Sequence, residues 1–149
     1  MSTVDALVAF YESLTPASLA RLERFYVPDA HFVDPFNEVR GVPAIAAIFS
    51  HMFASVAAPR FVVHTRCTGE GVAMLVWTFH GTLAGRAIAF EGATQFIFAS
   101  DGRVQTHRDF WDAAGAFYES VPVLGAMLRC VRGRLAAPQP GGTEMPPAR

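Results

Sequence analysis

The chain contains no lysine, so all 12 of its basic residues are arginines. Catalysis through a lysine Schiff base and a phosphate-binding loop of the Walker type both need a lysine amine. The sequence therefore excludes both. The net charge is only -1, and the arginines form no basic stripe, which argues against nucleic acid as a partner.

Cysteine is scarce as well, with Cys67 and Cys130 alone and far apart. The two residues form neither a CxxC pair nor a set with metal-ligand spacing, and the first residues lack the charged and then apolar pattern of a signal segment. No run of about 18 apolar residues is present, so no integral membrane segment is expected. We predict a reduced, cytoplasmic protein.

The common sequence signatures of several enzyme classes are also missing. The chain has no GxSxG, GxGxxG or HExxH motif, and its five histidines have no spacing that places two of them as ligands on one helix. These absences predict that the protein holds no metal and uses no cofactor. Its chemistry, if it has any, should be carried out by ordinary side chains.

What the sequence does contain is enough apolar material for one folded domain. Of its 149 residues, 52% are hydrophobic, and a chain of this length can bury a real core. We expect a single domain over residues 1–136. The last residues, 137–149, are rich in proline and glycine and predict a disordered tail.

The first part of the chain has helical periodicity. Apolar residues recur at helical spacing from Leu7 to Leu14 and again from Leu19 to Tyr26, with a break at Thr15 and Pro16. A third helix is predicted from about Pro43 to just before Pro59, with Phe49 on its apolar stripe.

From Arg60 to Asp112 the period changes to two, with breaks at glycine residues. This pattern predicts four long antiparallel strands, at residues 60–68, 72–84, 86–99 and 103–112. Helices followed by a meander of strands indicate an α+β fold, not an alternating parallel one.

A terminal helix is predicted at residues 122–135, where an apolar face runs from Val123 to Leu135 and three arginines lie at positions 129, 132 and 134. The pattern leaves three roles open for this helix. It could complete a subunit interface, cover a cavity or contact a membrane surface.

The stretch AHFVDPFNEVRG places the acid Asp34 between a short apolar strand and Pro35. An acid in this position often only hydrogen-bonds the backbone of a turn. The local sequence by itself favours that structural role, so a functional role for Asp34 needs support from the rest of the chain.

The order of elements, together with VDP at Asp34 and GRVQTHRDFWD at the end of the last strand, resembles the NTF2-like superfamily, especially its SnoaL-like polyketide cyclases and ketosteroid isomerases. The likeness covers residues 4–112. It implies a cone in which a curved mixed or antiparallel sheet wraps around a long helix and encloses an apolar cavity. In this superfamily the outer face of the sheet commonly forms a homodimer.

The resemblance also implies a site. Asp34 matches the general base of the isomerases, whereas their oxyanion-stabilising tyrosine and protonated aspartate fall on Phe10 and Thr94, which argues against a genuine steroid isomerase. His107-x-Asp109 looks like a pattern common near the end of SnoaL-like proteins, in which an aspartate acts as acid and base. The implied cavity wall consists of Phe10, Phe49, Trp77, Phe79, Thr94, Phe96 and Trp111.

Two functional hypotheses follow. The first is a cofactor-independent isomerase or cyclase that transfers protons on a small hydrophobic carbonyl compound, with Asp34 and Asp109 as acid and base and His107 orienting or sharing the proton. The second is a non-catalytic module of the same fold that binds a small hydrophobic molecule or takes part in an assembly. Both hypotheses predict a cavity.

Overall fold

The computed structural model describes residues 3–118 and 122–137. Its helices are α1 (Thr3–Glu12), the 3-10 helix η1 (Pro16–Arg24), α2 (Val42–Ser55), the short α3 (Ala113–Ala116) and α4 (Pro122–Leu135). Its strands are β1 (Tyr26–Val33), β2 (Glu38–Arg40), β3 (Val56–Gly69), β4 (Val72–Leu83), β5 (Arg86–Phe98) and β6 (Val104–Trp111). The tail predicted from residue 137 onwards lies outside these residues, apart from Ala137.

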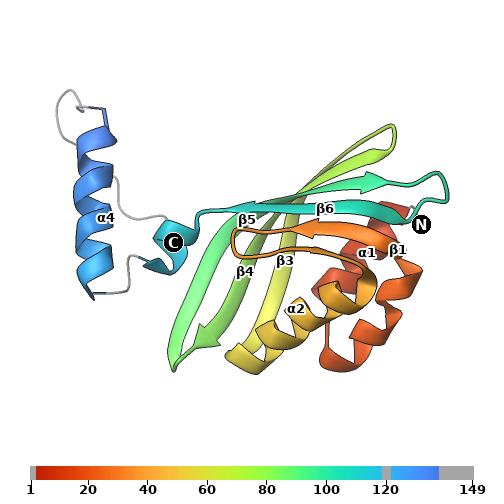
Figure 1. The fold of residues 1–149 in the computed structure, drawn as a ribbon, viewed down its shortest axis with the longest axis horizontal. Coiled ribbons are helices and arrows are strands. Elements are labelled where there is room, and N and C mark those ends of the chain that lie inside the picture. Colours follow the sequence, from red (N-terminus) through yellow and green to blue (C-terminus); the bar gives the residue numbers. More distant parts are fainter. Residues whose placement is uncertain (1–2, 119–121, 138–149) are drawn as a thin grey trace.

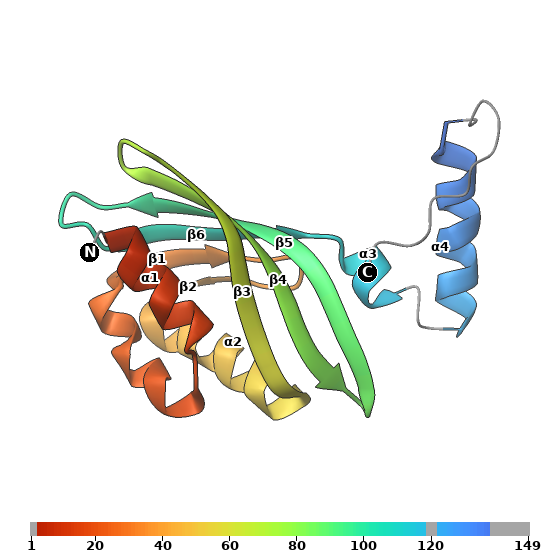
Figure 2. The ribbon, with the colours of Figure 1, turned by 180° about the vertical axis from the view of Figure 1, so that it is seen from behind.

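The six strands form one curved sheet in the order β2-β1-β6-β5-β4-β3. Strand β1 pairs with β6 in parallel, and the other neighbouring strands are antiparallel. Helices α1, η1 and α2 lie together against the concave side of the sheet (Figures 1 and 2). The predicted α+β fold with a curved mixed sheet is confirmed.

Two boundaries differ from the sequence prediction. Tyr26, expected to end the second helix, instead opens β1, which extends over eight residues because it pairs with β6. Helix α2 ends at Ser55, and β3 begins at Val56, four residues before the expected start. The three residues of β2 were not predicted at all.

Local signals explain where the first helices begin. Thr15 caps η1 through a capping box with Ser18, and Pro16 follows in the first turn, where a missing N–H costs nothing. Gly41 precedes α2 with a φ of 92°, a left-handed conformation that a glycine adopts without strain. Pro43 then occupies the first turn of α2.

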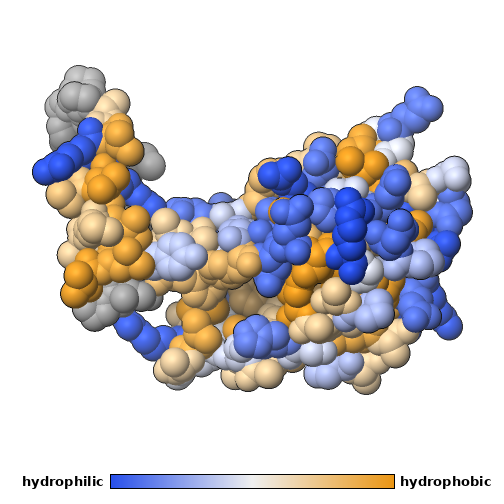
Figure 3. Space-filling model, in the orientation of Figure 1, coloured by the Kyte–Doolittle hydropathy of each residue, from blue (hydrophilic) through white to orange (hydrophobic). Residues whose placement is uncertain are grey.

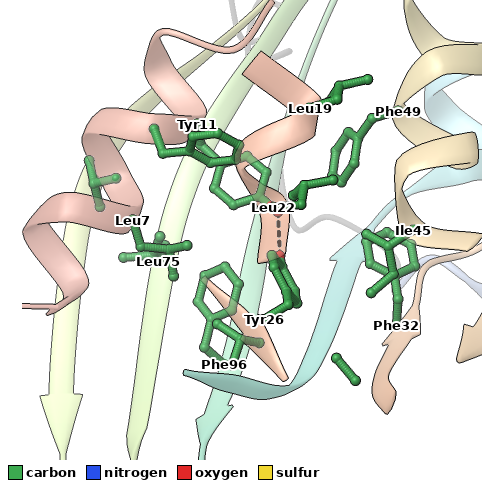
Figure 4. Packing of buried hydrophobic residues seen from close by; sticks show 14 of the residues in the cluster. Leu7, Tyr11, Leu19, Leu22, Tyr26, Phe32, Ile45, Phe49, Leu75 and Phe96 are labelled. Atoms are coloured by element: carbon green, nitrogen blue, oxygen red, sulfur yellow. Dashed lines mark hydrogen bonds between the residues drawn. The ribbon is translucent and has the colours of Figure 1, made fainter. Parts of the chain in front are cut away.

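The core lies between the three helices and the concave face of the sheet. Leu7, Leu22, Ile45 and Tyr26 are each 0% exposed, and Figure 4 shows side chains from α1, η1 and α2 converging on Tyr26 and Phe96. Burial of this apolar area is the main force that holds the helices against the sheet.

Alternation along the strands sorts residues between the two faces of the sheet, as the period of two predicts. Trp77, Phe79, Thr94, Phe96 and His107 are all buried on the concave face. On the outer face, Met74, Val76, Ile97 and Phe110 remain 36% to 47% exposed. These four apolar side chains of the outer face are therefore uncovered in the single chain.

Gly92 makes room for the largest side chain of the concave face. It lies opposite Trp77 on β4, and a Cβ atom at this position would lie 2.3 Å from the indole ring. Because any side chain at residue 92 would collide with the ring, the glycine allows Trp77 to lie flat across β5.

The predicted terminal helix is present as α4, and it stands away from the body of the molecule in Figures 1 and 2. Arg132 contacts Asp112, at the end of β6, at 3.2 Å. Val123 and Leu135 are more than 80% exposed, and apolar residues cover much of the helix surface in Figure 3. None of the described helices is long and apolar enough to span a membrane.

Candidate active site

The centre of the candidate site is the pair His107 and Asp109 on β6. The two residues are separated by one position, so their side chains project from the same, concave face of the strand. His107 is 2% exposed, and its Nε2 lies 2.8 Å from Asp109 Oδ1. The predicted side-by-side placement of an imidazole and a carboxylate is therefore present in the structure.

Two tyrosines complete the surroundings of His107 from the other side. Tyr26 Oη lies 2.6 Å from His107 Nδ1, and Tyr11 forms a very short hydrogen bond with Tyr26. Tyr11 comes from α1 and Tyr26 from β1, so three distant parts of the chain meet at one imidazole. All three side chains are buried.

The hydrogen bonds allow the protons to be assigned. Suppose that Tyr11 donates a hydrogen bond to Tyr26 and that Tyr26 donates one to Nδ1 of His107. The imidazole proton is then on Nε2, which donates a hydrogen bond to Asp109, and each of these protons has an acceptor. If Nδ1 instead donated to Tyr26 and Tyr26 donated to Tyr11, the Tyr11 hydroxyl would meet only a protonated Nδ1, at 3.4 Å, and its proton would have no acceptor among the described residues. We therefore assign His107 as the neutral tautomer protonated on Nε2.

Asp109 is bound from its second side by Thr94 of β5. The Thr94 hydroxyl donates to Asp109 Oδ1 at 2.5 Å, and the indole N–H of Trp77 donates to Thr94 Oγ1 at 2.8 Å. Both His107 and Thr94 thus bind the same carboxylate oxygen. Within the part of the chain that the structure describes, Oδ2 of Asp109 receives no hydrogen bond.

Burial keeps the two tyrosines protonated. Desolvation raises the pKa of Tyr11 above its ordinary range, and the nearby negative charge of Asp109 raises it further, although the hydrogen bond to Tyr26 acts in the opposite direction. Desolvation likewise raises the pKa of Tyr26, with added contributions from Tyr11 and Asp109. Both hydroxyls therefore remain donors at neutral pH.

Two hollows that share lining residues adjoin this network. An inner pocket of about 20 Å³ lies against Tyr11, Thr94, Phe96 and His107, and is large enough for roughly one water molecule. An outer pocket of about 280 Å³ opens beside it, which is near the lower limit for small-molecule sites. Asp109 and the aromatic residues Phe49, Phe61 and Trp77 line both pockets.

Asp34 also lines the outer pocket, but its carboxylate is already engaged. Oδ1 accepts the backbone N–H groups of Phe36 and Asn37, each at 2.7 Å, and the Asn37 side-chain amide contacts both carboxylate oxygens at 3.0 Å. This is an Asx turn, the structural role that the local sequence favours. Asp34 and Asp109 therefore border one pocket with very different surroundings.

The structure brings together most of the residues that the sequence suggested. Phe49 and Trp77 line both pockets, Thr94, Phe96 and His107 line the inner one, and Phe79 and Trp111 line the outer one. Phe10 lines neither of these pockets, because its ring packs against Phe25 at 4.5 Å between α1 and η1.

Sequence reasoning missed the two tyrosines. Tyr11 was expected to point away from the cavity because it lies about 100° around the helix from Phe10. In the structure, α1 is rotated so that Tyr11 faces inward and takes the place expected for Phe10. Tyr26 was placed in a helix, and only its pairing with β6 brings it to His107.

Within residues 3–118 and 122–137, no group of three or more His, Cys, Asp or Glu side chains is arranged to hold a metal ion. A carboxylate with one oxygen held by two donors and the other facing an apolar pocket is suited to accept a proton from a bound molecule.

Comparison with known proteins finds a matching family model and solved structures of similar fold. A family model described as a SnoaL-like domain matches residues 7–107. No curated protein matches the chain. Among solved structures, a protein from Jannaschia assigned as a SnoaL-like polyketide cyclase is 17% identical, with a TM-score of 0.66, over 92% of this chain and 93% of its own.

Two further structures show the range of proteins that share this fold. An epoxide hydrolase of the LEH-like type from Mycobacterium tuberculosis is 19% identical, with a TM-score of 0.65, over 86% of this chain and 96% of its own. A protein from Catenulispora acidiphila with a ketosteroid isomerase-like fold, solved in complex with trimethylamine, is 15% identical, with a TM-score of 0.66, over 76% of this chain and 88% of its own. At these identities the likeness concerns the fold.

Proposed function

The chain belongs to the SnoaL-like domain family, and we propose that it is an enzyme that isomerises or cyclises a small hydrophobic carbonyl compound by proton transfer, without a cofactor. The observation that supports this proposal is the state of Asp109. One of its oxygens is held by His107 and Thr94, while the other has no hydrogen bond from a described residue, in a side chain that is 15% exposed and lines the pocket.

In this proposal Asp109 is both base and acid. Its Oδ2 takes a proton from the carbon next to the substrate carbonyl, which leaves an enolate, and the resulting carboxylic acid returns the proton to another atom of the substrate. No other group is consumed. A positioned acid or base of this kind typically contributes about 100-fold to 10,000-fold in rate.

His107 acts as a positioning residue in the same scheme. Its Nε2–H fixes the orientation of the Asp109 carboxylate, and the bond from Tyr26 to Nδ1 holds the imidazole in the tautomer that can donate. The indole N–H of Trp111, on the outer pocket, makes no hydrogen bond within the described part of the chain. We assign it as the donor available to a substrate oxygen.

Asp34 is the less suitable base because of its surroundings. Its two carboxylate oxygens accept four hydrogen bonds from Phe36 and Asn37, so neither oxygen is left without a partner to receive a proton from a bound molecule. The proposal therefore gives the proton transfer to Asp109 and leaves Asp34 as the acid that holds the turn at the pocket mouth.

The test is hydrogen exchange into a panel of compact cyclic ketones and diketones. Each compound is incubated with the protein in D₂O, and incorporation of deuterium next to the carbonyl is followed by mass spectrometry. We expect at least one compound to exchange faster with the wild-type protein than in buffer, and Asp109→Asn to abolish the gain. If no compound in the panel exchanges faster than in buffer, the proposal fails.

The second candidate is a module that binds a ligand without changing it. The outer pocket of about 280 Å³ and its aromatic lining support this function equally, since neither requires turnover. The panel separates the two functions. Saturable binding of a compound that shows no exchange would favour the binding module.

We also propose that the protein is a homodimer. Exposed apolar residues on the outer face of the sheet, Met74, Val76, Ile97 and Phe110, come from three adjacent strands, and a second copy would bury them. Burial of such a patch is favourable because it removes apolar area from water.

A further inference from the structure

We propose that the outer pocket binds a ligand that carries a positively charged ammonium group. Two carboxylates line this pocket, Asp34 and Asp109, and none of the described residues that line it is an arginine. The chain has no lysine. Since the pocket is also mostly apolar, its negative charges act on a bound molecule with little screening.

Among the residues that the structure describes, no arginine neutralises either carboxylate. Asp34 accepts all four of its hydrogen bonds from neutral amide groups of Phe36 and Asn37. Asp109 is paired with His107, which the hydrogen bonds assign as the neutral tautomer. The remaining imidazole at the pocket, His51, is on an exposed part of the rim beside Ser55.

The rest of the wall has the composition of an aromatic cage. Eight aromatic side chains line the outer pocket, and neighbouring rings lie close together, with 4.8 Å between the centroids of Phe90 and Trp111 and 5.1 Å between those of Phe36 and Trp111. The faces of such rings attract cations, and aromatic cages are a common way of binding quaternary ammonium groups.

These features select against other ligand classes. A carboxylate or phosphate would meet two like charges and neither an arginine nor a lysine among the described lining residues, and a large hydrophobic molecule exceeds the volume of about 280 Å³. A compact amine or ammonium compound satisfies both the charge and the size. The inference deepens the proposed function, because it takes the same pocket as the ligand site and names the class of ligand, but it does not depend on turnover.

The test compares a cation with its neutral isostere, phenyltrimethylammonium with tert-butylbenzene. The chain has two tryptophans, Trp77 and Trp111, and both line the outer pocket, so intrinsic tryptophan fluorescence reports directly on its occupancy. We expect the cation to bind roughly tenfold or more tightly than the isostere. Equal or tighter binding of the isostere, or no binding of either compound, would overturn the inference.

Variants identify the source of the preference. The double variant Asp34→Asn with Asp109→Asn should bring the ratio of the two dissociation constants to about one, and each single variant should lower the ratio in part. Glu91→Gln removes one charge from an exposed position of β5 and should leave the ratio unchanged. Circular dichroism confirms that each variant is folded. A preference that survives in the folded double variant would contradict the proposal.

The two proposals fail in different ways. Binding that prefers the cation, with no deuterium exchange in any ketone, would refute proton transfer and leave the ligand class standing. Exchange in neutral ketones with no preference for phenyltrimethylammonium would refute the ligand class and leave proton transfer standing.

Discussion

His107 and Asp109 are joined by a hydrogen bond of 2.8 Å that occupies only one oxygen of the carboxylate. The same oxygen accepts from Thr94, so the second oxygen of this pocket-lining carboxylate has no partner among the described residues. The Asp109 side chain is only 15% exposed, and a carboxylate oxygen that is largely shielded from water and has no partner costs free energy. Such a cost is typical of groups that act on a bound molecule.

Removal of the Tyr26 hydroxyl should destabilise the protein. Tyr26→Phe removes the hydroxyl that bridges Tyr11 and Nδ1 of His107, and leaves these two groups only their longer contact of 3.4 Å. Poorly satisfied buried polar groups typically cost about 1 to 3 kcal/mol. Urea denaturation measures this loss. Tyr118→Phe, at a position 40% exposed, is the matched control and should leave the unfolding free energy unchanged. Equal stability of the two variants would contradict the assigned network.

Stability should fall steeply at alkaline pH. Burial raises the pKa values of Tyr11 and Tyr26 above 10.0 in the folded protein, so both phenols contribute fully to the free energy of unfolding below about pH 10. Above that pH, the unfolded chain releases protons that the folded protein retains. Each tyrosine should then lower the free energy of unfolding by about 1.4 kcal/mol per pH unit, until the pH reaches the pKa of that tyrosine in the folded protein.

The measurement is the urea midpoint between neutral pH and about pH 11.5, a range that includes the ordinary tyrosine pKa of about 10. In Tyr26→Phe the alkaline decline should be shallower than in the wild-type protein, since one buried phenol is absent. Parallel curves for the two proteins would mean that Tyr26 ionises in the folded state as readily as in the unfolded one.

Asp34 should prove to be a structural acid. Asp34→Ala removes the acceptor of the Phe36 and Asn37 backbone N–H groups, and we expect a loss of about 1 to 2 kcal/mol in thermal or urea unfolding. Asp34→Asn keeps an acceptor in the turn, because asparagine also forms Asx turns, and should recover most of that loss. Equal destabilisation by both substitutions would show that the charge itself holds the turn.

The outer face of the sheet should form the subunit interface. Sedimentation velocity should give the mass of a dimer for the wild-type protein and that of a monomer for Ile97→Glu, which places a charge on the exposed apolar patch. Leu135→Glu, on α4 and 81% exposed, should remain dimeric. A monomeric wild-type protein would remove the dimer from the account, and dissociation by Leu135→Glu alone would assign the interface to α4.

The sequence predicted the faces of the long strands well. A period of two fixes which residues of one strand share a face. The resemblance to known proteins then assigned to the cavity the face with His107 and Asp109, together with Trp77, Thr94 and Phe96 on the neighbouring strands. The acid in an Asx turn at Asp34 was also visible, since the turn residues lie next to it in the sequence.

The sequence could not predict contacts that depend on long-range pairing. Tyr26 reaches His107 only because β1 pairs in parallel with β6, about 80 residues later along the chain. The inward direction of Tyr11 depends on the rotation of α1 against the sheet, which helical periodicity alone does not fix when Phe10 and Tyr11 are both buried. The two tyrosines were missed for these reasons.

The most direct test of the account compares Asp109→Asn with Asp34→Asn on the compound that exchanges fastest with the wild-type protein. Both substitutions remove one negative charge from the same pocket, so a general effect of charge would lower the two rates alike. We predict that Asp109→Asn lowers the exchange rate at least about 100-fold, while Asp34→Asn changes it less than about fivefold. A large loss in Asp34→Asn with full activity in Asp109→Asn would contradict the assignment of Asp109 as the base.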